Sequence, residues 1–132
     1  VMGIYIVYQE SISFPEFLDK STGGWFKGKN PNLDKEILNN RWVEKAHVLY
    51  IGKAGGNNKS NLYKRINLFI KFGNGKNVAK RGGRAIWHLK DQGELLIAWK
   101  EIIDNEPREE EKGLIDKFVE KCNKKPFANF KR

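Results

Sequence analysis

The sequence predicts an α/β fold in which short strands alternate with helices in one domain of 132 residues. Three short apolar segments, 3–8, 48–52 and 95–99, have the length and the aliphatic or aromatic content of strands. Two longer segments, 61–72 and 107–123, repeat apolar residues at the spacing of a helix. A hydrophobic content of 39% is sufficient for a single core, so we expect one domain.

The charge of the chain predicts a negatively charged partner. Its 25 basic and 16 acidic side chains give a net charge of +9. Between Lys45 and Lys90 there is no Asp or Glu, whereas Lys and Arg recur throughout. Such a segment repels itself unless an anion binds it, and the phosphates of a nucleic acid are the expected anion.

The rest of the composition excludes other classes of protein. Apolar runs such as 95–99 are far too short to cross a membrane, so we expect no membrane partner. The single cysteine, Cys122, cannot form an internal disulfide or a cysteine-based zinc site. A lone thiol is typical of a reducing compartment, which predicts a cytoplasmic protein.

The first two strands each carry one tyrosine. The first, 3–8, reads GIYIVY, and alternation puts Tyr5 on the face opposite to its isoleucine neighbours. The second, 48–52, reads VLYIG; Tyr50 projects opposite to the residues beside it, and Gly52 ends the strand. A tyrosine at the edge of the core is the ordinary explanation for such positions.

The segment 9–46 between these strands is the hardest to assign. Ser13 followed by Pro15 resembles a helix cap and first turn. The glycines and asparagines of 22–31 predict a loop, and 34–46 is expected to be a helix.

The helix predicted at 61–72 follows a glycine-rich loop and has Ser60 as its expected cap. Arg65 lies three residues after Leu62 and four before Phe69, so it borders the apolar stripe. Either its guanidinium reaches water from the edge of the core, or the helix holds it rigidly at the edge of a cleft.

The segment 73–84 is basic and rich in turns, and it is either a solvated loop or a loop that follows phosphates. The basic side chains here and at the end of the preceding helix are the predicted nucleic-acid contacts: Lys71, Lys76, Lys80, Arg81 and Arg84. The short piece 85–89 has no clear type. His88 has no second histidine at metal-ligand spacing and His47 is distant, so both are expected to be ordinary polar residues.

The last strand and the last helix are both apolar. The run 95–99, LLIAW, predicts a buried central strand. In the helix 107–123, Glu111 points along the middle of the apolar stripe near the N-terminus. It either interacts with the helix dipole at the rim of the core or serves as a metal ligand or catalytic carboxylate. The acid-free stretch upstream, which offers no other carboxylate to a cation, favours the second explanation.

Five short motifs follow one another along nearly the whole chain. They are Gly3-Ile4-Tyr5, Tyr50-Ile51-Gly52 followed by Lys53, Leu62-x-x-Arg65, Glu111-x-x-Leu114-Ile115 and Pro126-x-x-Asn129. Together, in this order, they resemble the GIY-YIG nuclease family. Two of the motifs also contain the charged residues, Arg65 and Glu111, that periodicity alone places beside apolar stripes.

The resemblance implies a fold and a reaction. The fold would be a small α+β domain with a three-stranded antiparallel sheet between helices. The reaction would be hydrolysis of a DNA phosphodiester with one divalent ion, Mg²⁺ or Mn²⁺, held by Glu111. By the same resemblance Arg65 would bind the scissile phosphate and Asn129 would orient the site from the C-terminal end.

The resemblance also assigns roles to the two tyrosines. Tyr50 would be the general base for the attacking water, and Tyr5 would hold the geometry beside it. Because an ordinary tyrosine has a pKa near 10, a cation must favour the phenolate of Tyr50. Lys53 and the metal ion are the candidates.

Two features depart from the family pattern. The motifs Gly3-Ile4-Tyr5 and Tyr50-Ile51-Gly52, here called the first and second triad, are usually about ten residues apart in the family. Here the domain 1–132 contains an insertion at about 9–46 between them. Some restriction-type members carry such insertions, which suggests a specificity element or a homodimer contact. The position four after the arginine is often His or Tyr, but here it is Phe69, which cannot transfer a proton. Either that role is dispensable, or His88 or Lys80 supplies it, or activity is weak.

Three functions remain open from the sequence. The first is a metal-dependent endonuclease that cuts or nicks DNA. The second is a non-catalytic nucleic-acid-binding module on the same fold, which Phe69 favours. The third is a protein-interaction domain built around the insertion.

Overall fold

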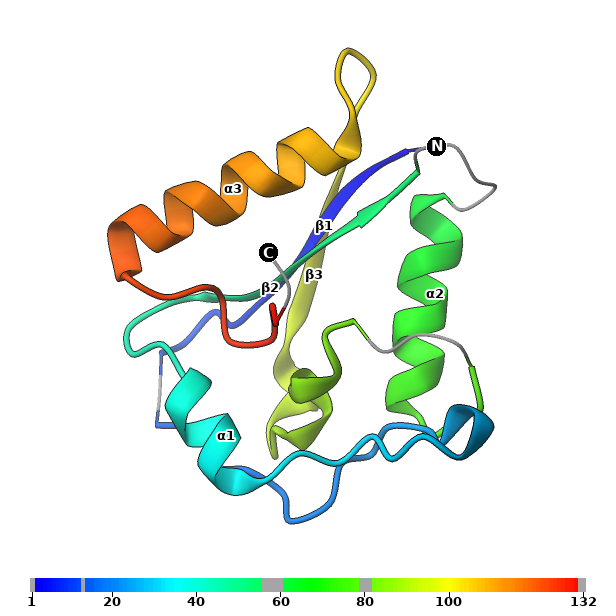
Figure 1. The fold of residues 1–132 in the computed structure, drawn as a ribbon, viewed down its shortest axis with the longest axis vertical. Coiled ribbons are helices and arrows are strands. Elements are labelled where there is room, and N and C mark those ends of the chain that lie inside the picture. The colour runs from blue at the N-terminus through cyan, green and yellow to red at the C-terminus, as the bar shows by residue number, and fades with distance from the viewer. Residues whose placement is uncertain (1, 13, 56–60, 79–81, 131–132) are drawn as a thin grey trace.

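A computed structural model of the chain shows an α+β fold built around one antiparallel sheet (Figure 1). The residues it describes are 2–12, 14–55, 61–78 and 82–130. The sheet order is β2-β1-β3, so β1 pairs with both neighbours. The strands are β1 (Gly3–Tyr8), β2 (Val48–Ala54) and β3 (Leu96–Glu101). The predicted three-stranded antiparallel sheet with flanking helices is therefore confirmed.

Two long helices flank the sheet, α3 on one side and α2 on the other (Figure 1). Asn61 caps α2, because its side-chain oxygen accepts a hydrogen bond from the backbone N–H of Lys64 at 3.0 Å. The predicted cap, Ser60, lies outside the described residues. Pro107 begins α3, and Asn123 ends it with a left-handed φ of 63°. None of the helices within the described ranges is long and apolar enough to cross a membrane. The helices are α1 (Lys35–Arg41), α2 (Leu62–Gly73) and α3 (Pro107–Cys122), with short 3-10 turns η1 (Phe26–Gly28), η2 (Arg84–His88) and η3 (Gln92–Glu94).

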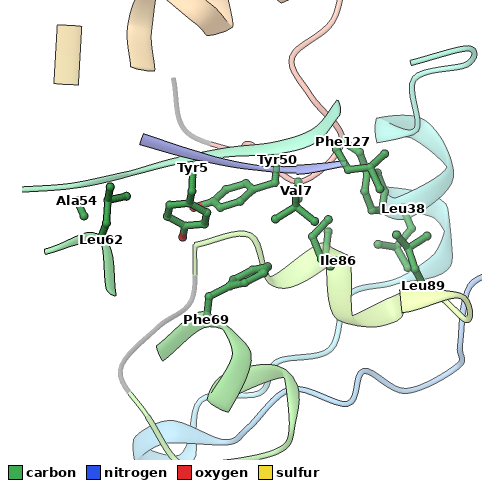
Figure 2. Close-up of a cluster of buried hydrophobic side chains, with 13 residues drawn as sticks. Tyr5, Val7, Leu38, Tyr50, Ala54, Leu62, Phe69, Ile86, Leu89 and Phe127 are labelled. Carbon is green, nitrogen blue, oxygen red and sulfur yellow. The ribbon is translucent and has the colours of Figure 1, made fainter. Parts of the chain in front are cut away.

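The two faces of the sheet differ as the alternation along β1 predicts. Tyr5 belongs to the buried core cluster on the side of α2, together with Tyr50 of β2 and Phe69 (Figure 2). Ile4 and Ile6 line a groove beside α3 on the other face. The two tyrosines of the triads therefore share one face of the sheet.

The predicted buried central strand at 95–99 is wrong in both position and burial. β3 starts at Leu96 and lies at the edge of the sheet, next to β1 only. Most of its residues are exposed, and Trp99 is 64% exposed. An apolar run does not indicate how many neighbours a strand has, and here the central position belongs to β1.

The insertion 9–46 contains less helix than predicted. Residues 14–20 are not helical, and Ser13, the expected cap, lies outside the described residues. The helix predicted at 34–46 ends at Arg41, because the next residue adopts an extended conformation.

The insertion contacts η2 and the residue that follows it. These contacts, rather than the helix expected near Ser13, hold the insertion to the domain. Phe17 forms an isolated antiparallel bridge with Leu89. Nε2 of His88 accepts a hydrogen bond from the backbone N–H of Leu33 at 2.9 Å. This leaves the proton on Nδ1, which lies 3.2 Å from the carbonyl oxygen of Leu18 and donates to it. His88 is fully buried, and burial lowers its pKa.

Candidate active site

The tyrosines of the two triads form one phenol pair. Strand pairing sets Tyr5 opposite Gly52 and Tyr50 opposite Val7. The two rings meet edge to face, with centroids 5.9 Å apart and an interplanar angle of 65° (Figure 2). Tyr5 is 1% exposed and Tyr50 is 7% exposed. Both phenols therefore lie inside the core face of the sheet, next to each other.

The glycines of the two triads are required by close contacts. A Cβ on Gly52 would lie 2.5 Å from Cζ of Tyr5, because the phenol ring lies across β2 at that point. A Cβ on Gly3 would collide with the backbone carbonyl oxygen of Lys100 on β3. Glycine at these two positions thus allows the ring and the neighbouring strand to approach closely.

Phe69 of α2 covers the phenol pair with an apolar ring. It stacks on Tyr50 with centroids 5.8 Å apart and an interplanar angle of 11°, and its centroid lies 6.1 Å from that of Tyr5. Trp87 packs against Phe69 at 4.9 Å. Since Phe69 has no group that can transfer a proton, it contributes packing at this position.

The histidines do not supply the proton-transfer group that Phe69 lacks. Both ring nitrogens of His88 bind backbone atoms of the insertion. Nδ1 of His47 lies 2.8 Å from the carbonyl oxygen of Gln9. Both are the ordinary polar residues that the sequence predicts, and the other candidate, Lys80, lies outside the described residues.

A guanidinium and a carboxylate act on the phenol pair from α2 and α3. Arg65 lies in the first turn of α2, Glu111 lies near the N-terminus of α3, and both are half-buried. Burial raises the pKa of both tyrosines most strongly; beyond it, the charge of Arg65 lowers and the charge of Glu111 raises each pKa. Arg65 and Glu111 thus each lie within electrostatic reach of the phenol pair, although the residues come from four elements.

A tyrosine is neutral at neutral pH, and burial moves the ionisation of both phenols to still higher pH. Burial raises the pKa of Tyr50 to about 12 and the pKa of Tyr5 well above its ordinary value of 10. The two phenols also shift the pKa of each other, because they are neighbours in the core.

Lys53 lies on the other face of the sheet. It is one residue beyond Gly52 on β2, so alternation directs its side chain to the same side as Ile51, toward α3. The basic side chain that lowers the pKa of Tyr50 is Arg65. Any effect of Lys53 on the phenol pair would therefore come from the side of the sheet on which α3, the helix that carries Glu111, lies.

Asn129 fastens the C-terminal segment to the second triad. Its side chain accepts a hydrogen bond from the backbone N–H of Ile51 and donates one to the carbonyl of the same residue, both at 2.9 Å. The backbone N–H of Ala128 donates to the carbonyl of Leu49 at 2.8 Å. Because Asn129 is only 6% exposed, these bonds are shielded from water and fix the backbone on both sides of Tyr50.

The predicted nucleic-acid contacts lie in different places. Lys71 and Lys76 are exposed, at the C-terminal end of α2 and in the turn that follows it. Arg84 is half-buried at the start of η2. Lys80 and Arg81 lie outside the described residues.

Glu111 is the carboxylate that would hold a divalent ion if this chain binds one. In the described part of the chain, no group of three or more His, Cys, Asp and Glu side chains gathers. Mg²⁺ commonly binds one or two carboxylates and takes its remaining oxygen ligands from water and substrate phosphates. A single carboxylate whose charge acts on both phenols has the donor chemistry that Mg²⁺ or Mn²⁺ requires there.

One basic residue lies beside the site although no pattern in the sequence predicts it there. Arg41, the last residue of α1, donates from Nη1 to the carbonyl of Asn129 at 3.2 Å, and its Cζ lies 4.3 Å from the centroid of the Phe130 ring. Arg84 lies over the same ring at 4.9 Å. No motif or periodicity connects the insertion with the C-terminus, so the contact is visible only in the folded chain.

The chemistry of the site can be stated from its groups alone. It contains a phenol that can accept a proton once it is ionised, a guanidinium that can bind phosphate and a carboxylate that can bind a cation. No protein-family model, curated protein or solved structure matched this chain. The motifs and the geometry of the site are therefore the features that indicate a function.

Proposed function

We propose that this chain is a metal-dependent endonuclease that hydrolyses phosphodiester bonds of DNA. The observation that carries the proposal is the packing of Tyr5 against Tyr50, with ring centroids 5.9 Å apart, together with the charges of Arg65 and Glu111, which act on both tyrosines. The three kinds of group match what the reaction needs: a proton acceptor for water, a positive partner for the phosphate and a ligand for a divalent ion. The net charge of +9 attracts the polyanionic substrate.

In this proposal Tyr50 accepts the proton of the attacking water, and Tyr5 holds the position of its hydroxyl. The pKa of about 12 must fall toward the working pH for Tyr50 to act as a base. Arg65 already acts in this direction. Mg²⁺ or Mn²⁺ bound at Glu111 would supply Lewis-acid stabilisation and cancel the negative charge that raises both phenol pKa values.

Arg65 is suited to bind the scissile phosphate. Its Nε is buried and makes no hydrogen bond within the described ranges, and the ion pairs found there do not include it. Within the described ranges, no salt bridge ties this guanidinium to a carboxylate. A planar guanidinium without a carboxylate partner is a strong donor to phosphate oxygens.

The test is Mg²⁺-dependent cleavage of supercoiled plasmid DNA by the parent, Tyr50→Phe and Glu111→Gln. Loss of a general base or of the metal ligand should lower the cleavage rate by about a hundred- to ten-thousand-fold. Tyr63→Phe and Glu109→Gln make the same chemical changes at exposed positions and should cleave like the parent. If the double variant Tyr50→Phe/Glu111→Gln cleaves as fast as the parent, the proposal is wrong.

A non-catalytic nucleic-acid-binding module is the second candidate. The near-complete burial of both phenols, together with the apolar stack of Phe69 on Tyr50, favours it, because ordinary core tyrosines pack in this way. It predicts salt-dependent binding of the plasmid without cleavage in either Mg²⁺ or Mn²⁺. Cleavage by the parent that Tyr50→Phe abolishes would exclude it.

A further inference from the structure

Two arginines from distant parts of the chain stack on one aromatic ring beside the candidate active site. The Cζ atoms of Arg41 in α1 and Arg84 in η2 lie 4.3 and 4.9 Å from the centroid of Phe130. All three side chains are half-buried. We call Arg41 and Arg84 the arginine pair.

The residues next to Arg84 and Phe130 in the chain place the arginine pair close to Tyr50. Gly83, which precedes Arg84, lies so close to Tyr50 that a Cβ on it would be 3.0 Å from Cε2 of that ring. Asn129, which precedes Phe130, holds the backbone of the second triad. The backbone next to Arg84 and Phe130 is thus held against Tyr50, the proposed general base, and against its neighbour Ile51.

The chemistry of Arg41 is suited to an anion. A guanidinium carries five N–H donors, and the hydrogen bond from Nη1 to the carbonyl of Asn129 uses one of them. The described salt bridges do not include Arg41. The Phe130 ring restrains the guanidinium, and the N–H groups that the Asn129 carbonyl does not use can donate to an anion. Phosphate oxygens suit this arrangement because they accept two parallel N–H bonds.

We infer that the arginine pair binds a second backbone phosphate of the nucleic acid, adjacent to the scissile phosphate on Arg65. This rests on the proposed function, since it places a neighbouring nucleotide of the same substrate. It also gives the insertion 9–46 a role: through Arg41, α1 becomes part of the substrate-binding surface.

The first experiment measures binding of a short fluorescent DNA duplex by the full chain over a range of salt concentrations, without divalent ions so that no cleavage occurs. Arg41→Ala should weaken binding by about tenfold and lower the slope of log K against log salt by about one. Arg41→Lys should keep the slope, because the charge remains, but bind more weakly than the parent because it lacks the planar fork. Lys117→Ala removes one exposed positive charge from α3 and should match the parent.

The second experiment locates the phosphate. Replacing single phosphates of the duplex with neutral methylphosphonates should weaken binding by the parent at two neighbouring positions. Arg41→Ala should lose sensitivity at one of these positions and Arg65→Ala at the other. A purely structural role of Arg41 would lower affinity at every position equally, and that pattern would overturn the inference.

The outcomes separate this inference from the proposed function. If the parent does not bind DNA, both are wrong. If the parent binds and Arg41→Ala has the same affinity and salt slope, only the arginine-pair inference is wrong. Inorganic phosphate should compete for the pair only weakly; competition at concentrations that match the affinity for DNA would assign the pair to a small anion and overturn the backbone-phosphate inference.

Discussion

Replacing Gly52 with alanine should destabilise the fold by disturbing the phenol pair. The new Cβ would lie 2.5 Å from Cζ, 2.6 Å from Cε1 and 2.8 Å from the hydroxyl oxygen of Tyr5. Packed carbon atoms are separated by about 3.5–4 Å, so the ring would have to move by about 1 Å. Tyr5 is 1% exposed and contacts Tyr50 and Phe69, which leaves it little room to move.

The size of the effect follows from overpacking in a rigid core. An added methyl group in a well-packed interior costs about 1–3 kcal/mol, and a ring enclosed by two other rings places this case at about 2–3 kcal/mol. With a urea m value of about 2 kcal/mol/M, the midpoint of urea unfolding should fall by about 1–1.5 M. The m value itself should stay unchanged if only stability is altered.

The assay is urea unfolding followed by tryptophan fluorescence, with Gly113→Ala as the matched control. A Cβ on Gly113 meets no atom within 4 Å, and this residue lies inside α3. That substitution should therefore stabilise the chain by about 0.5–1 kcal/mol through helix propensity.

A double variant tests the cause of the loss. In a Tyr5→Leu background the ring is gone, so Gly52→Ala should cost clearly less than it does in the parent. An unchanged unfolding midpoint for Gly52→Ala, or an equal cost with and without the Tyr5 ring, would show that the contact between Gly52 and the ring does not limit packing here.

Three further predictions concern stability and pH. Asn129→Leu leaves two buried backbone groups of Ile51 without partners and should lower the free energy of urea unfolding by about 2–4 kcal/mol. Asn129→Asp should also destabilise the fold, because it sets a buried carboxylate oxygen against the carbonyl oxygen of Ile51. Burial lowers the pKa of His88, so as the pH falls the unfolded chain takes up a proton before the folded chain does. The stability of the fold should therefore decrease as the pH drops below about 6.5. His88→Gln should make the thermal midpoint less dependent on pH in this range. Burial raises the pKa of Tyr5 and Tyr50, so stability should fall as the pH rises above about 10, and an absorbance titration should show both phenols ionising only with unfolding.

Local patterns in the sequence indicated most elements of the fold correctly. The alternation of β1 and the helical spacing around Arg65 and Glu111 depend only on neighbouring residues, and the structure has both helices and the strand where these patterns lie. The prediction failed for β3, because strand order depends on pairing partners far away in sequence. It also failed for 14–20, where the bridge from Phe17 to Leu89 replaces a locally plausible helix.

The sequence by itself determined which chemical groups the molecule has and on which elements they lie: two phenols on adjacent strands, a guanidinium on α2 and a carboxylate on α3. Only the tertiary structure decided that these groups act on one another, that burial holds Tyr50 at a pKa of about 12, and that Arg41 reaches the C-terminal segment. The physical reason is that periodicity reports the face on which a residue lies along its own element. Distance and desolvation, which set electrostatic interaction and pKa, arise only when separate elements pack against each other.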